Sequence, residues 1–381
     1  MTLKYDWVIV GAGFTGATLA ERIASILHQR VLLVERRDHL GGNAYDYYDQ
    51  HGLLVHKYGP HIFHTASGKI WKYLGNFTNW HSYNHKVLAE IEGKRVPLPF
   101  NINSLHALFP ANKAKRLEKA LLREYQAGAG VQVMEMLKNP DRQLRELAAF
   151  VYEKVFYDYT LKQWGFPPDK LDPRVAGRVP FRINRDDRYF TDAFQGIPQA
   201  GYNSLFKRML DHEKIKVMLK TDFRDIKSDF SQARIIHTGM IDEHFNYVHG
   251  PLPYRSQRFK FVHYSCTRYQ EVGTVNYPDS RPCTRSTEFK HLTGQECPGT
   301  TVVYEYPEAF RIGTNEPYYP VPRVENQRLY RKYLHESAKT KGIYFAGRLG
   351  DYSYYNMDQA VARALKLFEK IRANNPGKPR P

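Results

Sequence analysis

Residues 5–35 read YDWVIVGAGFTGATLAERIASILHQRVLLVE, and this stretch decides the fold. Residues 5–10 form a largely apolar run that predicts a buried parallel strand. Gly11-Ala-Gly13-Phe-Thr-Gly16 follows at once, and apolar residues then recur at helical spacing as far as Leu27. Residues 31–34 predict a second strand, which Glu35 closes. A strand, a glycine turn, a helix and a second strand in this order predict a Rossmann-like dinucleotide-binding unit.

Each glycine of the turn has its own expected role. Gly11 allows the tight turn, Gly13 lets the backbone approach a pyrophosphate, and Gly16 lets the helix pack on the strand. The N-terminus of the helix offers free N–H groups and a positive dipole end to the phosphates. Glu35 can accept hydrogen bonds from the adenosine ribose, so this segment predicts a binding site for a dinucleotide.

Two further segments favour FAD over NAD. The Gly41-Gly42 pair comes shortly after Glu35 and resembles the second signature of glutathione-reductase-like and amine-oxidase-like FAD folds; an ordinary glycine turn is the alternative. Late in the chain, residues 342–347 predict a strand that ends in glycine, and residues 357–368 predict a helix. FAD folds of this kind bring such elements back to the isoalloxazine, where a helix N-terminus stabilises negative charge. We therefore expect a discontinuous FAD-binding domain.

The middle of the chain predicts two further regions. Residues 105–156 are rich in Leu, Ala, Lys, Arg and Glu and predict helices, broken near residues 128–130 and 139–140. Residues 76–99 and 235–330 alternate aromatic and polar residues between Pro and Gly turns, which is typical of an antiparallel sheet. The predicted fold is α/β, with a Rossmann-like FAD-binding domain (1–75, 195–235 and 340–375), an inserted helical domain (100–170) and an antiparallel β-sheet domain (76–99, 171–194 and 236–339).

The composition points to an anionic partner. The 56 Lys and Arg against 39 Asp and Glu give a formal net charge of +17, which suits nucleic acid, a membrane surface or a phosphorylated small molecule. The basic residues are dispersed, which favours a mostly solvated basic surface, although their mixture with 28 tyrosines also leaves a nucleic-acid binder open. The start of the chain lacks the pattern of a signal peptide, no apolar run is long enough to span a membrane, and the three cysteines suggest no disulfide framework, so we expect a cytoplasmic protein without membrane insertion.

Other catalytic machinery is not evident in the sequence. It contains no nucleophile elbow, no spacing typical of metal ligands and no second glycine fingerprint. We therefore expect no metal site, and the flavin is the one reactive group with a strong sequence signal.

Five segments suggest a site for a sugar diphosphate. They contain paired histidines, aromatic residues and arginines, and they are Tyr58-Gly-Pro-His61-Ile-Phe-His64-Thr65, Phe156-Tyr-Asp-Tyr159-Thr160-Leu-Lys-Gln-Trp164, Arg178-Val-Pro-Phe-Arg182-Ile-Asn-Arg185-Asp-Asp-Arg188-Tyr189, Tyr254-Arg255-Ser256 and Glu316-Pro-Tyr318-Tyr319-Pro320. In this order they resemble the bacterial UDP-galactopyranose mutase family over nearly the whole chain.

The resemblance implies roles for particular residues. Tyr159 and Trp164 would pack against uracil with Thr160 nearby, and Arg178 and Arg255 would clamp the diphosphate. Tyr189, Tyr319 and Tyr354 would donate hydroxyls to the diphosphate, His85, Asn246 and Asn356 would contact the substrate, and His61, His64 and Arg348 would lie near the flavin. The residues with expected catalytic roles are Arg178, Arg255, Arg348 and His64. The expected cofactor-binding residues are Gly11, Gly13, Phe14, Thr15, Gly16, Glu35, Arg36, Gly42, Asn43, His61, Ile62, Arg348, Tyr355, Asn356, Met357, Asp358, Gln359 and Ala360.

The chain departs from the family pattern at two positions. His85 stands where some members carry Asn, and Asn356 stands where many carry Asp, which argues against an essential general base at residue 356. Arg182, Arg185 and Arg188 are interpreted as solvated surface charges. Residues 170–182 resemble a mobile loop that closes over UDP.

The resemblance also implies a reaction. Members of the family interconvert UDP-galactopyranose and UDP-galactofuranose with reduced FAD, whose N5 acts as the nucleophile at sugar C1 while UDP leaves and later returns. An external reductant and a homodimer are expected, and nucleic acid is not. An amine-oxidase-like FAD oxidoreductase and a polyanion binder remain the alternatives, and tolerance for N-acetylated sugars stays open.

Overall fold

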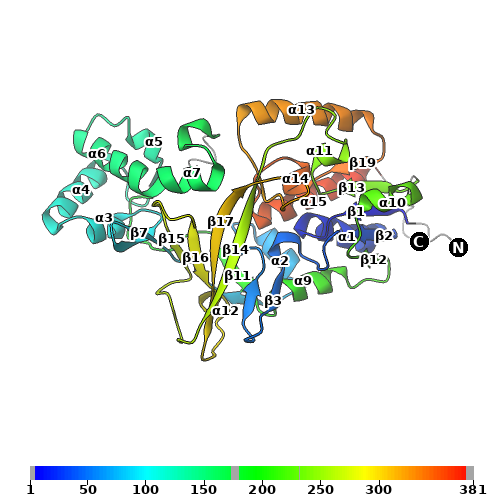
Figure 1. The fold of residues 1–381 in the computed structure, drawn as a ribbon, viewed down its shortest axis with the longest axis horizontal. Helices are drawn as coiled ribbons and strands as arrows, with labels where there is room; N and C mark the ends of the chain where they lie inside the picture. Colours follow the sequence, from blue (N-terminus) through cyan, green and yellow to red (C-terminus); the bar gives the residue numbers. More distant parts are fainter. Residues whose placement is uncertain (1–4, 173–179, 231, 375–381) are drawn as a thin grey trace.

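A five-stranded parallel sheet forms the centre of the predicted dinucleotide-binding region (Figure 1). The computed structural model describes residues 5–172, 180–230 and 232–374. In spatial order the strands are β12 (Ile215–Met218), β2 (Val31–Val34), β1 (Trp7–Val10), β13 (Arg234–His237) and β19 (Ile343–Phe345). β1 and β2 are buried almost throughout, as their apolar sequences predict. Strands from both ends and the middle of the chain therefore share one sheet, which confirms the predicted discontinuous Rossmann-like α/β fold.

Helices complete this region. Those on or beside the sheet are α1 (Phe14–Leu27), α9 (Gly201–Leu210), α10 (Phe223–Ile226), η4 (Lys227–Phe230), α11 (Ile241–His244), α13 (Val324–Lys339), α14 (Gly347–Gly350) and α15 (Met357–Ala373). α1 packs against α15, although more than 300 residues separate them in the sequence. Ala17, Ala20 and Ala24 of α1 are fully buried, and such small side chains allow close contact between helices. The predicted late strand and helix are thus both present.

A hairpin of two strands and a small sheet of three strands contain most of the segment after β2, together with β11 from later in the chain. The elements are η1 (Gly42–Ala44), β3 (Asp46–Tyr48), β4 (Leu54–His56), β5 (Phe63–Thr65), α2 (Gly68–Gly75), β6 (Trp80–Ser82) and β11 (Phe194–Pro198). β11 pairs antiparallel with both β5 and β6, so residues near 64 and near 195 lie side by side. This pairing brings the segment just before β11 next to His64.

The second large sheet has seven strands. In spatial order they are β18 (Tyr319–Pro320), β14 (Tyr254–Tyr264), β17 (Thr300–Ala309), β16 (Arg285–Glu288), β15 (Thr274–Asn276), β7 (Val87–Ile91) and β8 (Lys94–Leu98), with α12 (Phe289–Thr293) after β16. Its pairings are antiparallel, as expected, except for that of β15 with β7, which is parallel and differs from the expectation. The whole helical region separates β7 from β15, and no hairpin fixes their relative direction.

The helical region lies at the end of the molecule opposite the parallel sheet (Figure 1). Its elements are α3 (Ile102–Leu108), α4 (Ala111–Glu124), β9 (Gly130–Val131), α5 (Val133–Met136), α6 (Arg142–Val151), the π-helix η2 (Tyr152–Tyr157), α7 (Asp158–Trp164), η3 (Pro168–Lys170) and β10 (Phe181–Arg182). β9 begins at the end of the first predicted break, and α5 lies between the two breaks. The helices share one apolar core with β7 and β8, because residues such as Leu121, Leu147 and Val96 are buried together.

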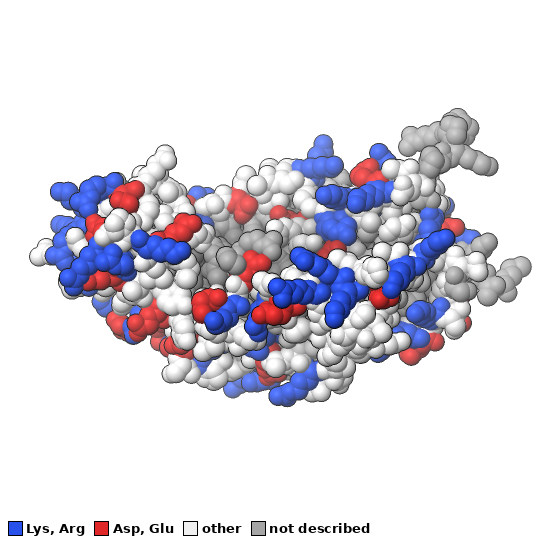
Figure 2. All heavy atoms as spheres, turned by 90° about the horizontal axis from the view of Figure 1, so that it is seen from above, with Lys and Arg blue, Asp and Glu red and all other residues white. Residues whose placement is uncertain are grey.

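Charged side chains of both signs are dispersed over the face shown in Figure 2. Figure 2 shows Lys and Arg across the whole visible face, with Asp and Glu between them. No helix in the described ranges is both long enough and apolar enough to cross a bilayer.

Candidate active site

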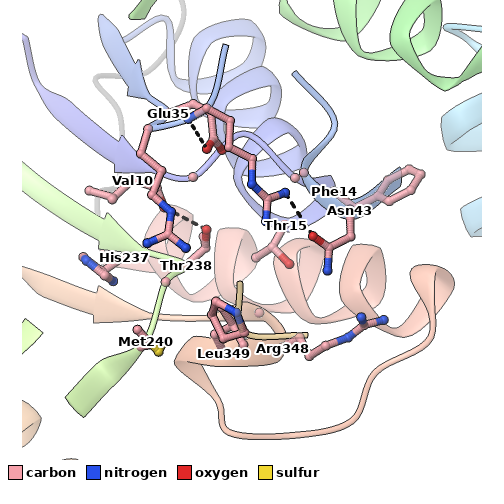
Figure 3. A pocket seen from close by; sticks show the side chains of 18 of the residues that line it. Val10, Phe14, Thr15, Glu35, Asn43, His237, Thr238, Met240, Arg348 and Leu349 are labelled. Carbon is pink, nitrogen blue, oxygen red and sulfur yellow. Dashed lines mark hydrogen bonds between the residues drawn. The ribbon is translucent and has the colours of Figure 1, made fainter. Parts of the chain in front are cut away.

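The first cavity, here called the nucleotide cavity, lies where β1, β2 and β13 end and α1 begins (Figure 3). Glu35 and Asn43 lie on one side of it, and Arg348 and Leu349 lie on the other. It is lined by thirteen of the predicted cofactor residues: Gly11, Gly13, Phe14, Thr15, Glu35, Arg36, Gly42, Asn43, His61, Arg348, Asn356, Met357 and Ala360. The sequence fingerprint and the late helix therefore converge on one space.

Glycines allow two loops to meet at this cavity. The N–H of Gly41 donates to the carbonyl of Ala12 at 2.9 Å. A Cβ atom on Gly42 would lie only 3.0 Å from the Cα atom of Gly13. A Cβ atom on Gly16 would lie 1.9 Å from the carbonyl oxygen of Gly11, so Gly16 serves close packing and does not line the cavity. The N-terminus of α1 carries no acidic residue and no side-chain cap, so its first N–H groups could bind an anion.

Glu35 is fixed at the edge of the nucleotide cavity. Its carboxylate accepts the N–H of Ala12 at 2.9 Å and the N–H of Arg37 at 3.0 Å. The Arg37 side chain then donates to Asn43 at 3.0 Å and to Glu316 at 2.9 Å, and it lies over the ring of Tyr58. The segment before β18 is thereby tied to the dinucleotide-binding loops.

The second cavity, here called the substrate cavity, lies between α7, the seven-stranded sheet and residues 189–192. It shares His61, Arg348, Asn356 and Met357 with the nucleotide cavity, so the two spaces meet at these residues. The substrate cavity is lined by most of the residues predicted to contact substrate: His85, Tyr159, Thr160, Trp164, Tyr189, Tyr319, Tyr354 and Asn356. His64 and Ile62 line it as well, whereas Tyr355, Asp358 and Gln359 are absent from the described linings of both cavities.

Aromatic side chains from α7, β18 and the loop before α15 lie close together. Trp164 is buried, and its ring centroid lies 5.9 Å from that of Tyr319 and 5.5 Å from that of Tyr354. The π-helix η2 directly precedes α7 and contributes Phe156 to the same lining. A π-helical turn shifts the register of the residues after it, and such turns are frequent at functional sites.

Arg255 is placed beside the substrate cavity and not in its described lining. Its guanidinium donates to the carbonyl of Gln163 at 3.0 Å and to that of Lys162 at 2.9 Å. It therefore satisfies two carbonyls at the C-terminal end of α7, where a cation is favoured. Burial lowers the pKa of Arg255, although an arginine stays charged.

Two other predicted substrate residues are not brought to the cavity by the described structure. Asn246 follows α11 with a φ of +51°, donates its N–H to Glu243 and lines neither cavity. Arg178 and most of the expected 170–182 loop lie outside the described residues.

Sequence reasoning missed Arg285. This residue lines the substrate cavity from β16, and its guanidinium forms a bidentate pair with Glu305 at 2.7 and 3.0 Å. Burial alone would lower the pKa of Arg285, but the Glu305 carboxylate more than offsets it and the pKa is raised. Arg285 is not part of an arginine-rich segment of the sequence. Its place on a strand beside the aromatic segments is the one signal that could have identified it as a site residue.

The interpretation of three arginines as surface charges is corrected for one of them. Arg182 is half-buried in the lining of the substrate cavity and donates to the carbonyls of Arg188 and Tyr189 at 2.8 and 3.0 Å. Arg185 and Arg188 are exposed and pair with Glu118 and Asp186, as expected of surface residues.

Two histidines of the substrate cavity are neutral at pH 7. Burial is the main reason that the pKa of His61 is lowered to about 4 and that of His85 to about 3, and the positive charge of Arg285 makes a smaller contribution to both shifts. The N–H of His61 Nδ1 donates to the Gly59 carbonyl at 2.9 Å, and His85 Nδ1 shares a hydrogen bond of 3.1 Å with the Tyr83 hydroxyl. His64 differs, because its Nδ1 lies 2.8 Å from the Asp192 carboxylate.

The described residues contain no group of three or more His, Cys, Asp or Glu side chains placed to bind a metal ion. Cys266, Cys283 and Cys297 are free thiols.

Comparisons with known proteins show the family and the fold of this chain. The family model for UDP-galactopyranose mutase matches residues 154–354, and the model for an NAD(P)-binding Rossmann-like domain matches residues 9–77. A probable UDP-galactopyranose mutase of Klebsiella pneumoniae is 36% identical over 369 residues, which cover 96% of this chain and 94% of that protein. A dTDP-fucopyranose mutase of Escherichia coli is 32% identical and covers 97% of this chain and 98% of its own. A crystal structure of reduced UDP-galactopyranose mutase superposes with a TM-score of 0.73 and 17% sequence identity, covering 98% of this chain and 94% of that one.

Proposed function

Because this chain belongs to the UDP-galactopyranose mutase family, we propose that it is an isomerase that interconverts UDP-galactopyranose and UDP-galactofuranose. The junction of the two cavities is the observation that carries the proposal. His61, Arg348, Asn356 and Met357 line both the dinucleotide site and the aromatic, arginine-containing space next to it. A cofactor in the first cavity can therefore meet a sugar nucleotide in the second.

The residues of the nucleotide cavity fit FAD. The contact of Gly42 with Gly13 leaves the loop backbone open to a pyrophosphate, and the uncapped N-terminus of α1 suits its charge. The N-terminus of α15, at Asn356 and Met357, lies at the junction, where it would face the ring system of the cofactor. When bound and reduced, the flavin supplies a nucleophilic nitrogen for C1 of the sugar.

The residues of the substrate cavity fit UDP. Tyr159 and Trp164 offer aromatic surface to uracil with Thr160 beside them, and Arg285 offers a fixed cation to the diphosphate. Tyr319 and Tyr354 add phenol groups next to Trp164. Charge on the diphosphate grows as the bond from C1 to oxygen breaks, so these groups would both hold UDP and stabilise it as the leaving group.

The arginines divide into two proposed roles. Arg285 would contact the diphosphate directly, and Arg178 keeps its proposed role there on the family resemblance alone. Arg255 would act through α7, since its guanidinium holds the carbonyls of Lys162 and Gln163 next to Trp164.

The remaining expectations rest on the family resemblance. We include an external reductant for FAD and a homodimer in the proposal. A cytoplasmic setting fits the three free thiols, because disulfides are rare in reducing compartments.

An anaerobic titration separates the isomerase from an amine-oxidase-like oxidoreductase. The protein, purified with oxidised flavin, is mixed with UDP-galactopyranose and its visible absorbance is followed. An isomerase leaves the flavin oxidised, because substrate and product have the same oxidation state. Stoichiometric bleaching of the flavin by the sugar nucleotide would contradict the proposal and favour the oxidoreductase.

A further inference from the structure

His64 lies in the lining of the substrate cavity and is held on three sides. It is the central residue of β5, paired across the strands with Gln195 of β11. The ring of Phe190 stacks on the imidazole at 3.7 Å with an interplanar angle of 12°. The Asp192 carboxylate lies 2.8 Å from Nδ1.

The turn that carries Phe190 and Asp192 is itself fixed. The side-chain amide of Gln195 is buried and donates to the carbonyl of Phe190 at 3.2 Å and to that of Asp192 at 3.0 Å. Gln195, which lies opposite His64 in the sheet, therefore holds residues 190–192 next to the imidazole of His64. Strand pairing, ring stacking and the carboxylate set both the position and the plane of the ring.

The partner of Nδ1 determines what Nε2 can do. An ionised carboxylate only accepts hydrogen bonds, so Nδ1 must carry the hydrogen and neutral His64 keeps a lone pair on Nε2. Among the described residues, the Asp192 carboxylate is the hydrogen-bond partner of this ring. Among the described residues that line the substrate cavity, Asp192 is the one with a carboxylate. Residue 356, at the junction of the two cavities, is an asparagine and has an amide. His61 and His85 bond to a carbonyl and a phenol instead.

We propose that Asp192 is a positioning residue that holds His64 in the Nδ1–H tautomer, so that Nε2 accepts a hydrogen bond from a hydroxyl of the sugar. This inference rests on the proposed isomerase function. A change of ring size moves one hydrogen from the oxygen that closes the new ring to the oxygen that the old ring releases. A fixed acceptor in the cavity would hold a sugar hydroxyl in one orientation during this exchange.

The test is Asp192→Ala, which removes the acceptor of the Nδ1 hydrogen. A matched control is Glu118→Ala, because Glu118 pairs with His106 at 2.7 Å on the helical region, away from both cavities. Three quantities are measured: kcat with UDP-galactofuranose, Kd for UDP, and the imidazole ¹⁵N chemical shifts of His64. The His64 signals are assigned by their loss in His64→Gln.

We expect Asp192→Ala to lower kcat roughly tenfold or more, because a histidine that loses its carboxylate partner also loses its fixed tautomer and orientation. The Kd for UDP should stay within about twofold, since Asp192 is not among the residues proposed to contact uracil or the diphosphate. The His64 signals should leave the pattern of the Nδ1–H tautomer. Glu118→Ala should leave all three quantities unchanged. A His64 tautomer that stays the same in Asp192→Ala, or a kcat equal to that of the unaltered protein, would overturn the inference.

The spectroscopic arm also separates this inference from the proposed function. If the unaltered protein converted no sugar nucleotide, the isomerase proposal would fail. A tautomer change in Asp192→Ala would still support the positioning of His64 by Asp192.

Discussion

Arg285 and Glu305 face each other directly across β16 and β17 and form a bidentate ion pair at 2.7 and 3.0 Å. Glu305 is almost fully buried, whereas the Arg285 side chain is about a quarter exposed, at 28%. The pair therefore presents an oriented guanidinium at the wall of the substrate cavity. A preorganised cation of this kind suits a diphosphate better than a flexible surface arginine does.

Arg285→Lys should lower kcat/KM with UDP-galactopyranose about 10- to 100-fold, because Lys keeps the charge but loses the fork of charged hydrogen bonds. Lys is chosen over Ala because an unpaired, buried Glu305 would destabilise the fold. Arg281→Lys is the control, since Arg281 pairs with Asp279 and Glu90 and is not among the described residues lining the substrate cavity. Steady-state kinetics with equal constants for Arg285→Lys and the unaltered protein would remove Arg285 from the site.

Gly42→Ala should lose bound flavin, because the added Cβ atom would lie 3.0 Å from the Cα atom of Gly13 and push the two loops apart. Gly93→Ala is a matched control. Gly93 also has a positive φ, +75° against +56° for Gly42, but a Cβ atom there would have no neighbour within 4 Å. The flavin content per chain, measured by absorbance after purification, should fall only in Gly42→Ala. Equal loss in both variants would attribute the effect to backbone strain.

Trp164→Ala should weaken UDP binding about 10- to 100-fold, the scale of a lost stacking contact between a base and an aromatic ring. Trp164→Phe keeps an aromatic face against Tyr319 and Tyr354 and should recover most of the affinity. Calorimetric titration with UDP measures both constants. An unchanged Kd in Trp164→Ala would place the uracil elsewhere.

Acid should destabilise the fold through its buried histidines. Burial lowers the pKa of His56 to about 3, against an ordinary value near 6.5 in the unfolded chain. The folded state therefore resists a proton that the unfolded state accepts, so the stability that neutral His56 contributes is present above pH 6.5 and is lost as the pH falls toward 3. The loss at pH 5 is about 2 kcal/mol for such a group, from 1.36 kcal/mol per pKa unit.

Urea unfolding at pH 7 and pH 5 measures this effect. His56→Gln should reduce the difference in the free energy of unfolding between the two pH values, whereas His51→Gln, at an exposed position, should leave it unchanged. A pH dependence that is the same in all three proteins would show that burial of His56 does not set the acid response.

The sequence predicted best where backbone geometry restricts the residue type. Gly11 and Gly13 of the first turn, the Gly41-Gly42 pair and Met357 of the late helix all line the nucleotide cavity. Tyr159, Thr160 and Trp164, which the sequence groups in one aromatic segment, line the substrate cavity together because they lie on one helix, α7.

The sequence predicted least where a side chain depends on a distant partner. Arg285 is defined by Glu305 on the neighbouring strand, and Arg255 by the carbonyls at the end of α7. Neither relationship leaves a local pattern in the sequence. Similarly, β15 pairs parallel with β7 across the whole helical region, and no turn signal encodes that direction.

Conversion of UDP-galactofuranose, separated from UDP-galactopyranose by liquid chromatography, tests the central claim most directly. The account predicts conversion after the flavin is reduced with dithionite, little conversion with oxidised flavin, and no net consumption of the reduced flavin. Absence of UDP-galactopyranose under reducing conditions, with flavin bound and UDP binding intact, would contradict it.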